Sequence, residues 1–241
     1  MSALDFDRFE AITFDCYGTI VDWESGILAA LERLVGDRAR VIPPPEQLLE
    51  LFGRLEADAE HGPFRRYRDV LTDVAHGFAV ELGIERDEAR AAAFAASVAE
   101  WPPFADSVAA LRALGSRYRL AIVSNIDDDL FAATSTRLGV DFAEVVTAQQ
   151  VESYKPAPAH FHEVLRRLDL PIDRVLHVAQ SLYHDIAPAK ALGFTCVWVN
   201  RRSGRDGSGA TRPAVAAPDL ELPDLGSLAT MSGSARARPS G

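Results

Sequence analysis

Polar residues of the kinds that enzymes use stand at the ends of several apolar runs of this sequence or in the segments that follow those runs. The carboxylates, hydroxyls, amides and lysine concerned are Asp15, Thr19, Ser124, Asn125, Lys155, Gln180, Ser181 and Asp185. Such a set contains a candidate nucleophile and candidate proton acceptors, so it could carry nucleophilic or acid–base chemistry. Asp15 is the natural centre, because it ends a strongly apolar run and a tight Tyr-Gly-Thr turn follows it.

Each of these residues also has a purely structural explanation when it is taken alone. An aspartate can satisfy a turn, a serine can cap a helix, and an aspartate near a helix N-terminus suits the helix dipole. Their common position favours function instead, because they gather at the ends of runs that predict strands. The carboxyl ends of parallel strands lie side by side in a doubly wound sheet, so we expect one site around Asp15.

Short apolar runs that alternate with helical periodicity predict the frame that positions these residues. The predicted strands span 11–15, 120–123, 144–147, 175–179 and 195–199. The predicted helices among the later strands span 108–114, 130–138, 159–168 and 186–192. Fully apolar strands that alternate with helices indicate an α/β fold, a doubly wound parallel sheet with a Rossmann-like core.

The segment 22–102 differs from the rest because its periodicity is helical throughout. Prolines at 43–45, the pair Gly62-Pro63 and the prolines at 102–103 divide and close it. An all-helical insertion after the first strand predicts a cap domain. We therefore expect a core of residues 1–21 and 103–230, a helical cap of residues 22–102, and a disordered tail of residues 231–241.

The composition argues against several classes of function. The chain of 241 residues has a net charge of −10 and a pI near 5.1, which disfavours broad binding to nucleic acid or to anionic membranes. Its two cysteines do not make a disulfide framework. The first residues lack the basic and apolar segments of a secretory leader, and no run approaches a membrane span. We expect a cytoplasmic protein.

The motif series resembles that of the haloacid dehalogenase superfamily. The similar elements are Phe14-Asp15-x-Tyr17-Gly18-Thr19, Ser124-Asn125, Lys155-Pro156 and Ser181-x-x-x-Asp185, together with the helical insertion after the first of them. Phosphatases of that superfamily carry a second aspartate two residues after the nucleophile and a Gly-Asp after the third motif strand. This chain has Tyr17 and Ala179-Gln180 there, which resembles the (S)-2-haloacid dehalogenase branch, a branch that works without metal.

The resemblance implies covalent hydrolysis of a small anionic 2-haloacid to a 2-hydroxy acid, with neither a metal ion nor a cofactor. Asp15 would displace the halide from carbon and form an ester, which water would hydrolyse. Lys155 would hold Asp15 ionised, and Asp185 would orient Lys155 or activate the water. The hydrogen-bond donors to Asp15 or to the substrate would be Thr19, Ser124 and Asn125.

The resemblance also implies substrate contacts and leaves other functions open. The expected substrate-binding residues are Tyr17, Ser124, Asn125, Arg54, Gln180 and Ser181. Arg54 is the expected cap arginine that receives the halide, and a solvated helix arginine is its alternative. The alternative functions are a Mg²⁺-dependent phosphatase with an altered acid and a non-catalytic binding protein. The oligomeric state stays open; relatives are often dimers, and Trp101 and the cap helices are the candidate surface for a homodimer.

Overall fold

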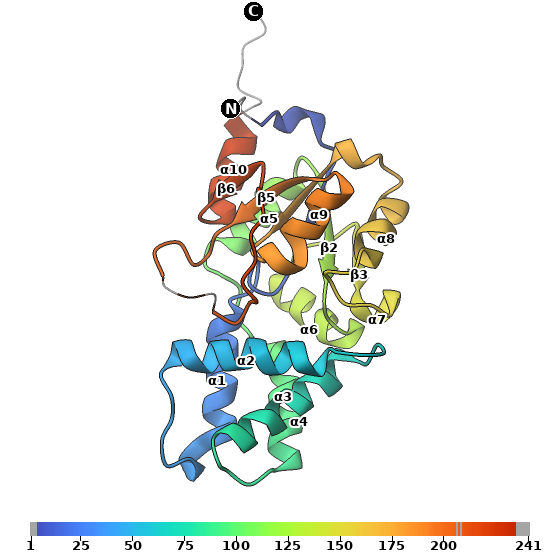
Figure 1. Ribbon diagram of the computed structural model, residues 1–241. Helices are drawn as coiled ribbons and strands as arrows, with labels where there is room; N and C mark the ends of the chain where they lie inside the picture. Colours follow the sequence, from blue (N-terminus) through green and yellow to red (C-terminus); the bar gives the residue numbers. More distant parts are fainter. Residues whose placement is uncertain (1–3, 206, 208, 235–241) are drawn as a thin grey trace, which may run out of the picture.

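A six-stranded parallel sheet forms the centre of the computed structural model, which describes residues 4–205, 207 and 209–234 (Figure 1). The strands are β1 (Ala11–Phe14), β2 (Arg119–Ser124), β3 (Glu144–Thr147), β4 (Val175–Ala179), β5 (Thr195–Val199) and β6 (Leu220–Leu222). Their order is β3-β2-β1-β4-β5-β6, and all neighbours are parallel. The predicted fold class is confirmed, and the strand order reverses beside β1, where such sheets bind ligands.

Helices occupy most of the remaining chain. The α-helices are α1 (Trp23–Val35), α2 (Pro45–Ala59), α3 (Tyr67–Glu81), α4 (Glu88–Ala96), α5 (Ser107–Gly115), α6 (Asp128–Leu138), α7 (Ala148–Val151), α8 (Ala159–Leu168), α9 (Ala187–Leu192) and α10 (Leu225–Ser234). A π-helical turn, η5 (Leu182–Ile186), precedes α9. The 3₁₀ turns are η1 (Phe6–Arg8), η2 (Gly36–Arg38), η3 (Ser97–Glu100) and η4 (Ile172–Arg174).

The two faces of the sheet are both covered, because successive strand residues point to opposite sides. Ile12 and Phe14 of β1 belong to the cluster that includes α5, α6 and α10. Ala11 belongs to the second cluster, with α8 and α9. The apolar runs that predicted the strands are therefore buried on both sides, as a doubly wound sheet requires.

The insertion after β1 is helical, and Figure 1 shows α1–α4 gathered together below the sheet. Asp22 begins α1 by accepting a hydrogen bond from the backbone N–H of Ser25. Within the insertion, Gly26 lies so close to Trp101 that a Cβ there would meet the indole ring at 2.3 Å. The absence of a side chain at Gly26 thus lets the end of the insertion pack directly on its beginning.

The C-terminal part contains structure that the sequence analysis did not predict. Residues 220–222 form the edge strand β6, and α10 extends to Ser234, so the first residues of the expected tail belong to a helix. Residues 235–241 of that expected tail lie outside the described residues. Leucines of this region dock on the core, with Leu225 and Leu228 fully buried.

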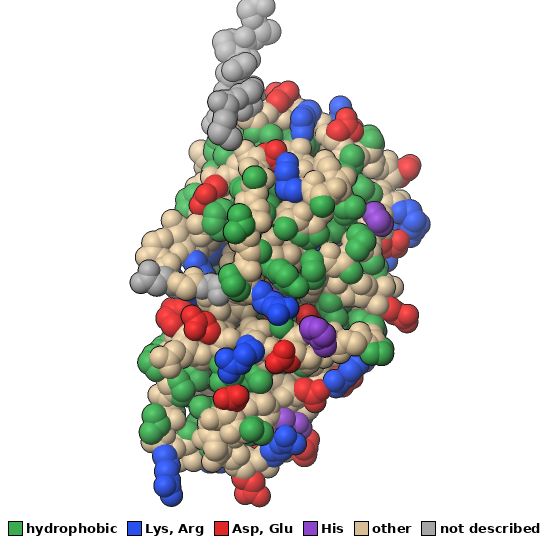
Figure 2. All heavy atoms as spheres, in the orientation of Figure 1, with side chains coloured by type: hydrophobic (Ala, Val, Ile, Leu, Met, Phe, Trp, Pro, Cys, Tyr) green, Lys and Arg blue, Asp and Glu red, His purple; other side chains and the backbone are tan. Residues whose placement is uncertain are grey.

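The distribution of charged side chains on the surface agrees with the argument from net charge against broad binding to nucleic acid or anionic membranes. Figure 2 shows acidic and basic side chains interspersed on one face, without a continuous basic band there. Among the described residues, no helix combines the length and the apolar character needed to cross a bilayer.

Candidate active site

Asp15 lies at the centre of a buried charge cluster. It follows β1 directly, and its backbone N–H donates to the carbonyl oxygen of Val178 in β4 at 3.1 Å. Lys155 Nζ donates to Asp15 Oδ1 at 3.0 Å and to Asp185 Oδ1 at 2.7 Å. Its third contact is the carbonyl oxygen of Val123, at 2.9 Å. The lysine therefore bridges two carboxylates and has all three of its hydrogen bonds filled.

Thr19 fixes the second oxygen of the Asp15 carboxylate. Its Oγ1 donates to Asp15 Oδ2 at 2.7 Å and accepts from the backbone N–H of Gln180 at 2.9 Å. The turn that brings Thr19 back to Asp15 uses Gly18 at a φ of 93°, a left-handed conformation that favours glycine. A Cβ at Gly18 would also lie 2.9 Å from the indole nitrogen of Trp23. The Gly-Thr pair of the motif is thus explained by backbone geometry and by one hydrogen bond.

Burial and ion pairing have opposite effects on the pKa values in this cluster. Burial raises the pKa of Asp15, and the Lys155 ammonium works against that rise. Burial would also raise the pKa of Asp185, but Lys155 and His177 lower it to about 2. For Lys155, burial would lower the pKa, but the two carboxylates raise it. Asp185 and Lys155 therefore form a charged pair that leaves Asp15 as a poorly solvated carboxylate, a suitable nucleophile.

His177 supports Asp185 from within the sheet. It stands in β4 opposite Thr13 of β1, and its Nδ1 lies 3.0 Å from Thr13 Oγ1. Its Nε2 lies 3.3 Å from Asp185 Oδ1. The sequence analysis did not predict this contact, because His177 reads as one more residue of a buried strand. The histidine is fully buried and reaches the site only through the carboxylate of Asp185.

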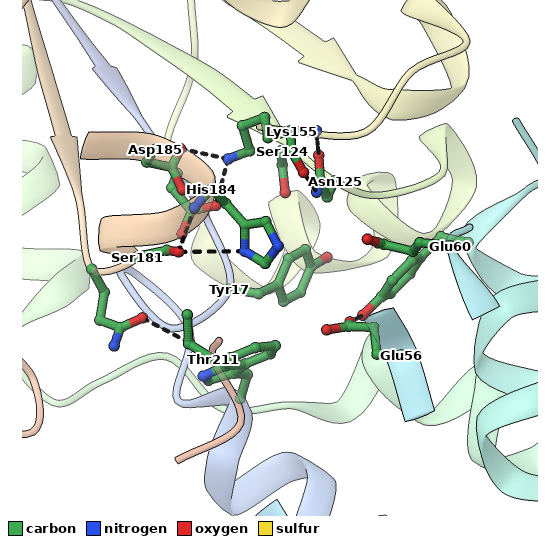
Figure 3. Close-up of a pocket in the computed structure, with 14 residues that line it drawn as sticks. Tyr17, Glu56, Glu60, Ser124, Asn125, Lys155, Ser181, His184, Asp185 and Thr211 are labelled. Atoms are coloured by element: carbon green, nitrogen blue, oxygen red, sulfur yellow. Dashed lines mark hydrogen bonds and ion pairs between the residues drawn. The ribbon is translucent and has the colours of Figure 1, made fainter. Parts of the chain in front are cut away.

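A cavity opens beside Asp15, between the carboxyl ends of the strands and the helical insertion (Figure 3). The sheet side supplies Asp15, Tyr17, Ser124, Asn125, Lys155, Gln180, Ser181, His184 and Asp185. The insertion supplies Trp23, Glu56, Glu60 and Tyr67, and the segment after β5 supplies Thr211. A molecule that reaches Asp15 therefore contacts the insertion as well as the core.

The predicted hydrogen-bond donors take different roles. Ser124 is buried at the end of β2, and its Oγ has no hydrogen-bond partner among the described residues, so it can serve a substrate. Asn125 instead binds the backbone of Lys155 in both directions, at 2.7 and 3.1 Å, and thereby positions that residue. Ser181 caps η5 by accepting from the backbone N–H of His184 at 2.9 Å.

Tyr17 lines the cavity, but its hydroxyl points elsewhere. The phenol oxygen lies 2.8 Å from Thr134 Oγ1 of α6, and the ring meets Trp101 edge to face at 5.9 Å between centroids. Burial raises the pKa of Tyr17 well above its ordinary value. Trp101 is only 2% exposed, so the expectation that it lies on a dimer surface is wrong.

Arg54, the predicted halide receiver, is not in this cavity. It is exposed on α2, 3.8 Å from Glu81 Oε1 of α3, and it lines a separate surface hollow with Asp58. Residues two apart on a helix point in nearly opposite directions, and here Glu56 faces the cavity. The helix orientation therefore removes Arg54 from the site and corrects that prediction.

The sequence analysis missed Glu56 and Glu60, two carboxyls that the end of α2 presents to the cavity. The available signal was the position of Glu56, four residues after Phe52 in the stripe that α2 buries. Unpaired acids are rarely buried, so an acid in such a stripe marks a special environment. The hydroxyl of Tyr67 donates to Glu56 Oε1 and satisfies one of its oxygens.

The fold and site together define a class: a doubly wound α/β protein whose helical insertion closes over a buried Asp–Lys–Asp centre. The chain belongs to the haloacid dehalogenase-like hydrolase family, whose family model matches residues 9–193. It is similar to haloacetate dehalogenase H-2 of Moraxella sp. (strain B), with 25% identity over 80% of this chain and 87% of that protein.

Two further comparisons extend over more of the chain. The (S)-2-haloacid dehalogenase H-109 of Pseudomonas putida is 25% identical over 91% of this chain and 96% of its own length. The crystal structure of an L-2-haloacid dehalogenase is 26% identical, with a TM-score of 0.78 over 92% of this chain and 99% of that one. These similarities confirm the family branch that the motif series resembled.

Proposed function

We propose that this protein is a metal-independent dehalogenase that converts short 2-haloacids to 2-hydroxy acids through an ester of Asp15. The chain is an (S)-2-haloacid dehalogenase-like hydrolase by its family and relatives. The observation that carries the proposal is the Asp15 carboxylate, which Lys155 and Thr19 hold at the cavity wall, with Tyr17 rather than a second acid two residues after it. Such an arrangement suits displacement of a leaving group that needs no proton.

The first step is a displacement at carbon. A carboxylate oxygen of Asp15 attacks C2 of the haloacid, the carbon–halogen bond breaks, and the halide leaves with the electron pair. Lys155 Nζ and Thr19 Oγ1 each hold one oxygen, so the carboxylate has a fixed direction of attack. The product of this step is an ester between Asp15 and the organic acid.

The second step is hydrolysis of that ester. Water attacks the ester carbonyl carbon, the bond to the substrate oxygen breaks, and the 2-hydroxy acid leaves. Asp185 Oδ2 is buried and has no hydrogen-bond partner among the described residues, so it is the group available to accept a proton from the water. The other proton of the water goes to the leaving oxygen, and the proton that Asp185 accepted then passes to solvent.

A halide is favoured over a phosphate ester because of the leaving group. An alkoxide needs an acid beside the nucleophile, and the candidate there is Tyr17. Its hydroxyl contacts Thr134 and its pKa is raised well above the ordinary value, so it is a poor proton donor. A halide is a weak base and leaves without a proton.

Chloride release from racemic 2-chloropropionate in the presence of EDTA tests the proposal. We expect release by the wild type and none by Asp15→Asn. Asp173→Asn is the matched control, because Asp173 lies in η4, the turn that directly precedes β4, at the end of the sheet away from Asp15. In heavy-oxygen water, a single turnover should place the label in the Asp15 carboxylate. Phosphate release that requires added Mg²⁺, without chloride release, would replace this proposal with a phosphatase.

The same proposal assigns residues 22–102 as the cap and residues 1–21 and 103–230 as the core. The mixed lining of the cavity supports this division. The homodimer and the cytoplasmic location stay predictions, and the mass of the protein in solution tests the former.

A further inference from the structure

Two carboxyl groups face the nucleophile across the cavity. Glu56 lies in the last turns of α2 and Glu60 directly follows that helix, so the two side chains share one face. Figure 3 shows both carboxyls directed into the cavity, on the side opposite Ser181 and His184. They belong to the insertion, whereas Asp15 belongs to the sheet, so they are placed to contact a part of the substrate away from the reacting carbon.

The cavity has too little positive charge to match these carboxyls. Among the described residues, no ion pair joins Glu56 or Glu60 to a basic side chain. Of the described residues that line the cavity, Lys155 alone is a lysine or arginine, and its three hydrogen bonds go to other acceptors. Arg212, next to the lining residue Thr211, lowers the pKa of Glu60 through space, and no ion pair joins the two among the described residues. Burial lowers the pKa of His184 to about 4, so this imidazole is neutral near pH 7.

The raised pKa values of Glu56 and Glu60 are those expected of two buried carboxyls that lack a cationic partner. Burial raises the pKa of Glu56 to about 7, against the hydrogen bond from Tyr67. Burial and the neighbouring Glu56 raise the pKa of Glu60 well above its ordinary value, although the charges of Lys155 and Arg212 act in the opposite direction. A cation between the two carboxyls would offset both effects, because it would stabilise their charged forms.

A second, independent feature points to a ligand in the same space. Ser124 is 1% exposed, lines the cavity, and its Oγ has no hydrogen-bond partner among the described residues. A buried hydroxyl without a partner is costly unless a ligand satisfies it. Ser124 lies beside Lys155, on the sheet side of the cavity, so its unpartnered hydroxyl and the two carboxyls lie on different sides of the same space.

We propose that Glu56 and Glu60 form a subsite for an ammonium group, and that the preferred substrate is a 2-haloacid that carries such a group at its far end. The substrate carboxylate then lies near Ser124 and the ammonium lies between the cap carboxyls. The reaction named here rests on the proposed dehalogenase function, whereas the cation subsite does not.

An isosteric pair of substrates tests the charge preference. 3-Amino-2-chloropropionate carries an ammonium group where 2-chlorobutanoate carries a methyl group. We expect wild-type protein to release chloride from the amino compound with the higher kcat/KM. Glu60→Gln and Glu56→Gln should each lower the ratio of the two kcat/KM values about ten- to hundredfold, the effect of losing one hydrogen bond to a charged group. Glu50→Gln, an exposed change on the same helix, should leave the ratio unchanged.

Binding of the corresponding hydroxy acids separates this inference from the reaction. Calorimetric titration compares 3-amino-2-hydroxypropionate with 2-hydroxybutanoate, in EDTA so that no metal ion occupies the carboxyls. We expect tighter binding of the amino compound, and loss of that preference in Glu60→Gln. Equal binding, including no binding of either compound, overturns the subsite, as does a preference that survives in both variants. A Glu60-dependent preference without chloride release keeps the subsite and refutes the dehalogenase.

Discussion

Replacing Glu56 with glutamine should make the stability of the protein less sensitive to alkaline pH. Burial raises the pKa of this carboxyl from 4.5 to about 7, so the folded protein binds its proton more tightly than the unfolded chain does. Stability from this group is therefore fully present below the unfolded pKa, and it is lost as the pH rises to the folded pKa. Glutamine keeps an oxygen for the Tyr67 hydroxyl and cannot ionise.

The size of the effect follows from the two pKa values. A rise of about 2.5 pH units at about 1.4 kcal/mol per unit corresponds to about 3.5 kcal/mol in total. Roughly 2.5 kcal/mol of this falls between about pH 5 and about pH 8, because the unfolded carboxyl is already mostly ionised at the lower pH. The variant should lack this loss, so its advantage over the wild type should grow by that amount across the interval.

Urea denaturation followed by tryptophan fluorescence at both pH values measures this difference. Glu50→Gln is the matched control, since Glu50 is exposed on the same helix, and it should change the free energy of unfolding by no more than about 0.5 kcal/mol at either pH. Parallel pH dependence in the wild type and in Glu56→Gln would refute the reasoning, because it would mean that the carboxyl is solvated in the folded protein.

Three further changes test the packing and the charge cluster. Lys155→Met leaves two buried carboxylates without their cation, so it should abolish chloride release and lower the free energy of unfolding by about 3–5 kcal/mol in urea. His177→Phe removes a contact that lowers the pKa of Asp185, so the acidic limb of the kcat profile should move to higher pH with KM unchanged. Gly26→Ala places a Cβ 2.3 Å from the Trp101 ring, and thermal unfolding should report a loss of about 1–3 kcal/mol.

A control variant and two contrary results test these three predictions. Lys190→Met breaks a partly exposed pair with Asp219 and should cost about 1 kcal/mol or less, so equal losses in the two lysine variants would contradict the role of burial. An unchanged pH profile of kcat in His177→Phe would mean that His177 does not influence the pKa of Asp185. Unaltered thermal stability in Gly26→Ala would mean that the insertion repacks freely.

The sheet was predictable because its evidence is local. Four of the five predicted strands are short, mostly apolar runs, which parallel strands buried on both faces need, whereas Glu144–Thr147 is only partly buried at its start. Leu220–Leu222 was harder to recognise, because three residues at a sheet edge carry little pattern. Within the insertion, the α-helix that ends at Ala96 changes to a 3₁₀ turn at Ser97, a detail that the helical periodicity of the segment does not resolve.

The site was predictable on the sheet side and not on the insertion side. Asp15, Lys155 and Asp185 meet because strand ends converge, which follows from the topology alone. Whether Arg54 or Glu56 faces the cavity depends on how α2 is rotated about its own axis. Packing between residues that are distant in the sequence decides that rotation. His177 looks like any core residue until its register opposite β1 is known.

The stretch that follows β5 ties the insertion to the sheet. Arg202 donates to Glu24 and to Glu46, both at 2.6 Å, and thereby connects it to α1 and α2. The carbonyl of Ala210 lies where a Cβ on Gly53 would come within 2.5 Å, so this stretch lies directly on α2. A chimera that exchanged only residues 22–102 between relatives would break these contacts. The structural unit that covers the site therefore consists of two separate segments, residues 22–102 and the stretch that follows β5. A chimera designed to change substrate range should exchange both segments.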